Sequence, residues 1–239
     1  MGTLNNEFDN WLPLETRTLR ESVTELIRRA IIEDRLEADS ELNQAQLAER
    51  LGISRGPVRE ALGRLEQEGL IRNVPYKGVY VTPLSPAYVR ELFSLRAVLE
   101  TFAVGYASEL PYPADLSDDL SALEDLVDKM RSAARRSDSL GLAELDIAFH
   151  RRLIEMARHE LLKKTWMPLE IGVQRCVYTR HQIYSSLDEV IGTHPTLISA
   201  IAERNVEQAK EILHDHIIEA GEMICRVWSE SKETGAEAG

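Results

Sequence analysis

The stretch from Ala87 to about Val227 carries helical patterns of apolar residues throughout, and strand-like alternation is absent from it. Helices of this length, joined by short polar or proline-containing connections, are typical of an antiparallel bundle. The polar residues 230–239 that follow are expected to form a disordered tail. The predicted helices span 86–109, 116–136, 139–158, 161–183, 187–203 and 206–228.

The segment before Ala87 has a different pattern, in which short helices at 15–35, 44–51 and 55–68 precede two short strands. Gly52 is placed to end the second helix and Ser54 to cap the third. Apolar runs at 70–74 and 79–81 flank a turn and predict a hairpin. Thr82–Pro86, with two prolines in five residues, marks a domain boundary. We therefore expect a mainly α chain with a flexible arm at 1–14, a winged helix-turn-helix domain at 15–82 and an all-α antiparallel bundle at 83–229.

The composition excludes several classes of protein. The 239 residues contain two cysteines, Cys176 and Cys225, and no apolar run of the ~20 residues that a membrane span requires. Membrane, collagen-like and disulfide-rich secreted proteins are therefore excluded, and a reducing cytoplasm is the expected location. The formal net charge of −12 argues against a nucleic-acid partner. Residues 50–77 reverse that sign, with six lysines and arginines against three glutamates, and suit either a phosphate backbone or a solvated helix face.

The third helix begins Ser54-Arg55-Gly56-Pro57-Val58-Arg59, and in a winged helix-turn-helix this end reaches base edges in the major groove. Arg55 and Arg59 lie one turn apart on one face, where a guanidinium can bind guanine or phosphate. Gly56 lets the backbone approach DNA, and Pro57 fits a first turn that needs no N–H. Lys77, at the hairpin tip, is placed to contact the adjacent backbone or minor groove. Apolar helix pairs around a glycine are common, so the pattern alone leaves DNA binding open.

Leu47–Leu62 and Leu65–Ile71 closely resemble the GntR family of bacterial transcription regulators, and the resemblance covers about 18–82. It implies that Ser54, Arg55, Gly56, Pro57 and Arg59 face DNA and that Gly78 lies in the wing. The chain departs from the family at two places. Asp34 and Ala38-Asp39 stand where the family often has Gly and Pro-Gly. Ala45 stands where many members carry an arginine, so that contact is either missing or made by a glutamine, and Gln44 and Gln46 flank the position.

Polar residues interrupt the inward stripes of three bundle helices. Asp146 and His150 lie four residues apart on one face, His194 lies within a second stripe and His216 within a third. His214 points away from that stripe at ~100° per residue and is expected to be solvated. The three imidazoles and one carboxylate suit Zn²⁺, with Ni²⁺, Mn²⁺ and Fe²⁺ as alternatives. A hydrogen-bonded core without metal is the other interpretation.

Arg96–Glu100, Asp146–His150, His194 and His216 resemble the all-helical C-terminal domain called FCD, over about 86–228. By that resemblance Asp146, His150, His194 and His216 are metal ligands, and the effector is a small organic acid. His159 stands where the family commonly has asparagine and is expected to lie at a helix end and not to be a ligand. Arg96 either pairs with Glu100 or binds the effector carboxylate, and Arg175 is a second candidate for the effector pocket.

The sequence therefore predicts a cytoplasmic, homodimeric transcription regulator, a repressor rather than an activator, with no membrane partner. Each protomer would bind one half of a near-palindromic DNA operator, with half-site centres ~34 Å or slightly less apart. One alternative is a metal-dependent hydrolase that uses the same ligands. It would need a general base, and no further inward carboxylate is evident at helical spacing near the ligands. The other alternative is a regulator whose histidine cluster is purely structural.

Overall fold

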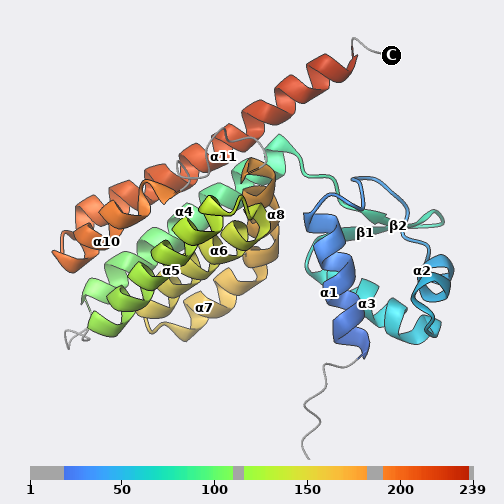
Figure 1. Cartoon of the computed structure of the whole chain (residues 1–239), viewed down its shortest axis with the longest axis horizontal. Helices are drawn as coiled ribbons and strands as arrows, with labels where there is room; N and C mark the ends of the chain where they lie inside the picture. The colour runs from blue at the N-terminus through green and yellow to red at the C-terminus, as the bar shows by residue number, and fades with distance from the viewer. Residues whose placement is uncertain (1–18, 110–115, 182–190, 237–239) are drawn as a thin grey trace, which may run out of the picture.

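The computed structural model describes residues 19–109, 116–181 and 191–236, so the predicted arm at 1–14 lies outside the described residues. In Figure 1 the chain forms two bodies, a small N-terminal domain and a bundle of longer helices. The fold is mainly helical, with a winged helix-turn-helix followed by an all-helical domain, as the sequence predicts. Within the described residues no helix is both long enough and apolar enough to cross a membrane.

The N-terminal domain packs three helices against a hairpin. The helices are α1 (Leu19–Ile32), α2 (Gln44–Leu51) and α3 (Arg55–Gln67). The strands β1 (Ile71–Val74) and β2 (Gly78–Val81) are antiparallel, and Ile71 pairs with Val81. Their apolar faces enclose one core, which α1, α3 and the hairpin share and which includes Ile27, Ile31, Val58, Leu62, Leu65 and Val81.

An extended segment in the connection between α1 and α2 pairs with β2 through backbone hydrogen bonds, which the sequence did not predict. The Leu42 N–H donates to the Val79 carbonyl at 2.7 Å, and the Val81 N–H donates to the Ser40 carbonyl at 3.0 Å. Asp34 and Asp39 adopt positive φ angles of 55° and 62° in this connection. Aspartate tolerates the left-handed region better than most residues, so it can replace the glycines that the family often uses there.

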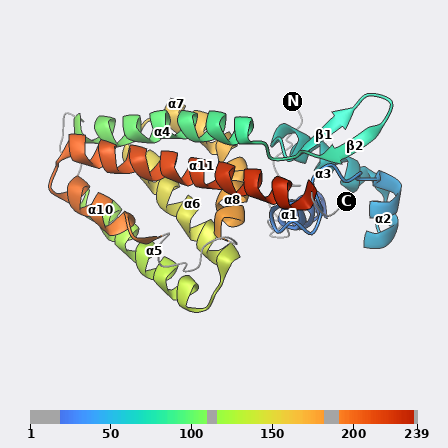
Figure 2. The ribbon, with the colours of Figure 1, turned by 90° about the horizontal axis from the view of Figure 1, so that it is seen from above.

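The C-terminal domain is a bundle in which α11 (Val206–Ala236) runs alongside α4 (Pro86–Glu109), as Figure 2 shows. One large apolar core fills it. The other elements are α5 (Ser117–Arg135), α6 (Ser139–Met156), α7 (Glu160–Trp166), a 3₁₀ turn (Met167–Leu169), α8 (Glu170–His181) and α10 (His194–Ala202).

Two expectations about this domain are wrong. The helix predicted at 161–183 is divided into α7, the 3₁₀ turn and α8, because Pro168 lacks an N–H and its ring clashes with the preceding helical turn. The tail predicted from residue 230 is helical as far as Ala236. Residues 229–234 contain neither proline nor glycine, so nothing in them stops α11. The first part of the helix predicted at 187–203 lies outside the described residues, up to 190.

The two domains meet where α8 approaches α1 and the linker that leads into α4. The Arg175 Nη1 atom donates to the Thr82 carbonyl at 2.7 Å, and Arg175 is buried. Ile171 packs against the N-terminal core. Arg175 was expected in the effector pocket, but in the structure its guanidinium holds the domain linker.

Close packing between α4 and α11 gives a test of the bundle. A Cβ added at Gly221 would lie 3.0 Å from the Cβ and Cγ atoms of Phe93, whereas a Cβ added at Gly63 in α3 would meet nothing within 4 Å. We expect Gly221→Ala to destabilise the protein by about 1–3 kcal/mol through overpacking. Gly63→Ala should stabilise it by about 0.5–1 kcal/mol. Thermal and urea unfolding measure both, and a stabilised Gly221→Ala variant would contradict this packing.

Candidate functional site

The first turn of α3 presents the residues that the sequence assigned to DNA. Ser54 is the N-cap residue, with extended backbone, but its hydroxyl makes no capping hydrogen bond. Ser54, Arg55 and Arg59 are exposed, and Gly56 and Pro57 are half-buried. In the part of the chain that the structure describes, neither Arg55 nor Arg59 has a carboxylate within ion-pair distance, so both guanidiniums are available to a ligand.

The hairpin loop and α2 lie at the end of the small domain that is far from the bundle (Figures 1 and 2). Gln44 opens α2 and is half-buried, and Asn43 caps this helix by accepting from the Ala45 and Gln46 N–H groups. This cap was not predicted, although an asparagine just before a helix is a known signal for a helix start. Lys77 is exposed in the loop, and Gly78 begins β2 with a φ of 127°.

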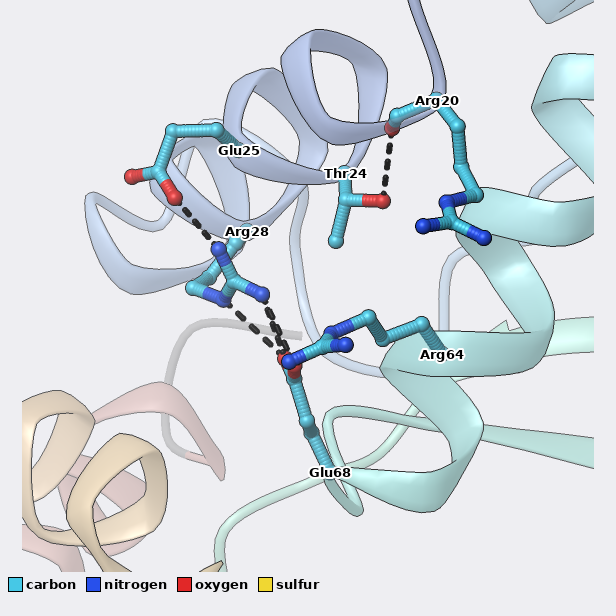
Figure 3. Close-up of polar contacts among 6 residues, drawn as sticks. All are labelled: Arg20, Thr24, Glu25, Arg28, Arg64 and Glu68. Carbon is cyan, nitrogen blue, oxygen red and sulfur yellow. Dashed lines mark hydrogen bonds and ion pairs between the residues drawn. The ribbon is translucent and has the colours of Figure 1, made fainter. Parts of the chain in front are cut away.

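Arg64 and Arg72, within the positively charged residues 50–77, have a structural role instead, as has Arg28 of α1. Figure 3 shows Arg28 of α1 bonded to Glu68, which follows α3, with contacts of 2.8–3.0 Å, and to Glu25. Arg64 pairs with the same Glu68 carboxylate at 3.1 Å. Arg72 pairs with Asp39 at 2.6 Å. The positive charge left without such pairing in this stretch therefore includes Arg55, Arg59 and Lys77.

In the bundle, Asp146, His150, His194 and His216 each offer one ligand atom, and these atoms lie within 4.8 Å of one another. The first two come from α6 and the others from α10 and α11. The first three are buried, and His216 is half-buried. The structure thus brings together all four residues that the sequence proposed as ligands. His214 is exposed and contacts Asp215, as expected from its place on the helix.

Several polar atoms in this cluster are buried without a hydrogen-bond partner among the described residues. They are Asp146 Oδ1, His150 Nε2 and both ring nitrogens of His194. The His194 Nε2 atom lies 3.3 Å from Asp146 Oδ1, and the His150 Nε2 atom lies 3.9 Å from Asp146 Oδ2. Buried polar groups are normally satisfied, so the unsatisfied atoms that these three residues offer to one cluster, one from each side chain, indicate a missing ligand. Imidazole and carboxylate are donors that Zn²⁺ and related metals prefer.

A second layer of residues holds His150 from behind. The Glu100 Oε2 atom lies 2.6 Å from His150 Nδ1, and Glu100 Oε1 accepts from Arg96 Nε at 2.6 Å and from Trp166 Nε1 at 3.0 Å. Glu100 and Arg96 are fully buried, as is Trp166. A carboxylate on one ring nitrogen of a histidine orients the other nitrogen toward a metal. The Arg96–Glu100 pair was one of the two alternatives predicted for Arg96, but the contacts of Glu100 with His150 and Trp166 were not predicted. The expectation that no further carboxylate points inward near the ligands is wrong.

The ionisation of these groups follows from burial and from their charged neighbours. Burial raises the pKa of Glu100, but Arg96 and His150 outweigh it and lower the pKa to about 2. Burial also raises the pKa of Asp146, while the neighbouring His194 and His150 bring it well below its ordinary value. Burial, reinforced by Arg96, lowers the pKa of His150, which favours the neutral ring that a metal requires.

Arg96 pairs with Glu100, which is one of the two roles that the sequence left open for it. Its Nη2 atom, however, is buried with no hydrogen-bond partner among the described residues. The guanidinium therefore keeps one donor for another group. His159 is the N-cap of α7, where its Nδ1 atom accepts from the Leu162 N–H at 3.2 Å, in agreement with the expected role at a helix end.

The buried Glu100 carboxylate predicts how stability depends on pH in metal-free protein. Its folded pKa is depressed, so the stability it contributes is complete above an ordinary pKa of 4.5 and is lost as the pH falls toward about 2. Glu100→Gln should therefore cost about 3–5 kcal/mol at neutral pH and flatten that acid-dependent loss.

Urea unfolding of chelator-treated protein over this pH range measures the effect. Glu222→Gln is the matched control, because Glu222 forms an exposed pair with Arg90 and should cost less than about 1 kcal/mol. Equal losses in the two variants would contradict the assigned role of Glu100.

Comparison with known proteins adds two family matches. The model of the FCD domain matches residues 91–219, and that of the bacterial regulatory proteins of the gntR family matches residues 19–81. The transcriptional repressor RspR of Escherichia coli K12 is 25% identical over 222 residues, covering 93% of this chain and 96% of that protein. A regulator from the TAR-I ttuE-ttuC' intergenic region of Agrobacterium vitis is 33% identical over 131 residues, or 55% and 76% of the two chains.

Among solved structures, E. coli McbR/YncC superposes with a TM-score of 0.72 and 21% identity, over 89% of this chain and 100% of that one. At this level of identity the likeness supports the fold alone.

Proposed function

Since the chain belongs to the GntR family of bacterial regulatory proteins and carries an FCD domain, we propose that it is a cytoplasmic repressor controlled by a metal ion and a small carboxylate effector. That it is a DNA-binding transcription regulator and not an enzyme follows from the family. The effector, the metal and the repressor role are our inferences, and the names of relatives such as the gluconate operon repressor of Bacillus subtilis favour the last of these.

The observation that carries the proposal is the convergence of unsatisfied buried atoms from Asp146, His150 and His194 beside His216. A hydrogen-bonded core without metal is disfavoured, because such a core would give His150 Nε2 and the His194 ring nitrogens well-formed hydrogen bonds, and the contacts with Asp146 at 3.3 and 3.9 Å do not supply them. Three imidazoles and a carboxylate would hold Zn²⁺ best, with Ni²⁺, Mn²⁺ or Fe²⁺ as alternatives. A bound metal would supply a Lewis acid that can accept an oxygen of a carboxylate effector.

We assign Arg96 as the protein side chain that binds the carboxylate of the effector. Its Nε atom is engaged by Glu100, while Nη2 has no partner among the described residues and is a charge-assisted donor for a carboxylate. Arg175 is less suited to this role, because its guanidinium already contacts the domain linker. Effector binding would change operator affinity through its different affinity for two arrangements of the domains.

The operator-binding form is proposed to be a homodimer that reads a near-palindromic site, one half-site per protomer. The outer face of α4 supports this assembly. It exposes Leu95, Val98, Phe102 and Tyr106, and Leu161 of α7 is exposed as well. An apolar stripe of this kind suits a protein interface rather than solvent, and a second copy would bury it.

Mutation of the first turn of α3 tests the DNA-binding surface. Arg55→Ala and Arg59→Ala should each weaken operator binding about tenfold, because each removes a contact worth ~1–3 kcal/mol. Arg64→Ala is the matched control, since Arg64 is paired with Glu68 and should leave affinity nearly unchanged. Fluorescence anisotropy at several salt concentrations measures the affinities of the three variants and the wild type. Equal affinities for all four proteins would contradict the assignment of this surface to DNA binding.

Elemental analysis tests the metal centre. Protein purified without a chelating tag and reloaded with Zn²⁺ should retain metal, whereas the His194→Ala/His216→Ala double variant should lose it because two of the four donors are gone. His214→Ala is the control, since His214 is exposed outside the cluster, and it should bind metal like the wild type. Near-zero metal in all three after reloading would favour a purely structural histidine cluster.

A further inference from the structure

Thr193, which immediately precedes the candidate ligand His194, stands at the start of α10 without capping it. Threonine is a favoured N-cap residue, because its hydroxyl accepts a hydrogen bond from a backbone N–H of the first helical turn. Among the described residues of that turn Thr193 receives no such bond, and its own backbone is already helical, with φ −85° and ψ −22°. Its Oγ1 atom lies instead 2.6 Å from the Nδ1 atom of His216 in α11. The hydroxyl therefore contacts the histidine cluster rather than its own helix.

This contact holds the least buried member of the cluster. His216 is half-buried, whereas the other three candidate ligands are buried. Its ring stacks on that of His150, with centroids 5.4 Å apart, and its centroid lies 4.9 Å from that of the His194 ring. Solvent access to a metal site is controlled by the groups around it, so the side of the cluster that His216 occupies is the side from which a metal can exchange.

The position of the ring proton decides whether His216 can bind a metal. A neutral imidazole carries its proton on one nitrogen and offers the lone pair of the other. Because Nδ1 of His216 is bonded to Thr193, Nε2 is the nitrogen left for the cluster. Nε2 is a metal donor only if Nδ1 carries the proton, and Nδ1–H then donates to the threonine oxygen. His150 has the same arrangement with a carboxylate, since Glu100 Oε2 lies 2.6 Å from its Nδ1.

We propose that Thr193 is a positioning residue for the metal centre, with its hydroxyl oxygen accepting a hydrogen bond from Nδ1–H of His216. The contact fixes the tautomer and the orientation of this ligand and slows the loss of the metal. A neutral hydroxyl polarises an imidazole less than a carboxylate does, so His216 is a weaker donor than His150 and the first ligand to dissociate. This inference rests on the metal centre proposed above.

Three variants of the full-length chain separate this role from folding. Thr193→Val keeps the shape of the side chain and loses its oxygen, so zinc-loaded protein should release Zn²⁺ to an excess of chelator about tenfold faster than the wild type. Thr193→Ser keeps an acceptor and should release Zn²⁺ at the wild-type rate. Thr196→Val is the matched control, because Thr196 is exposed in the first turn of the same helix outside the cluster, and it should also keep the wild-type rate.

Long-range ¹H–¹⁵N NMR of the histidine rings reads the tautomer directly in the zinc-loaded wild type, where His216 should carry its proton on Nδ1. A proton on Nε2 would overturn the proposal, as would equal release rates for Thr193→Val and Thr193→Ser. If the wild type and Thr196→Val retain Zn²⁺ and Thr193→Val releases it no faster, this inference alone has failed. If neither the wild type nor Thr196→Val retains Zn²⁺ after reloading, the proposed metal centre itself is wrong.

Discussion

The buried carboxylate of Glu100 is the interaction on which the C-terminal domain depends. It joins α4 to α6 through His150 and to α7 through Trp166, and it neutralises Arg96 within its own helix. A buried charge is tolerated only when it is paired and fully hydrogen-bonded, and Glu100 meets that condition with three donors. The same bonds direct His150 toward Asp146, so the packing of three helices and the orientation of one candidate metal ligand have a single cause.

The same helix connects this centre to the DNA-binding half. The linker that follows β2 leads directly into α4, which carries Arg96 and Glu100, and α8 holds the linker through the bond from Arg175 to Thr82. Burial lowers the pKa of Arg175 and outweighs the opposing effect of its neighbours, which include Asp34. The proposed metal centre and the DNA-binding domain are therefore connected through α4 and the linker that Arg175 contacts. Coupling of this kind needs only a difference in ligand affinity between two domain arrangements.

Local sequence patterns predicted the elements well and their tertiary contacts poorly. Helical periodicity placed Asp146, His150, His194 and His216 on inward faces, and bundle geometry then brought them together. Periodicity could not show that Glu100 would meet His150 and Trp166, because those contacts join residues 50 and 66 positions apart. The break at Pro168 was visible in the sequence and overlooked. Tyr76 has a φ of 64°, which local preference could not predict because this conformation favours glycine or asparagine.

The most direct test of the account is X-ray absorption spectroscopy at the zinc edge of the full-length, metal-loaded protein. The donor set of Asp146, His150, His194 and His216 predicts a first shell of nitrogen and oxygen only, with the multiple-scattering signal of three imidazoles. Sulfur scatterers would place the metal at Cys176 or Cys225 instead. A shell without imidazole would contradict the central claim that this cluster is a metal centre.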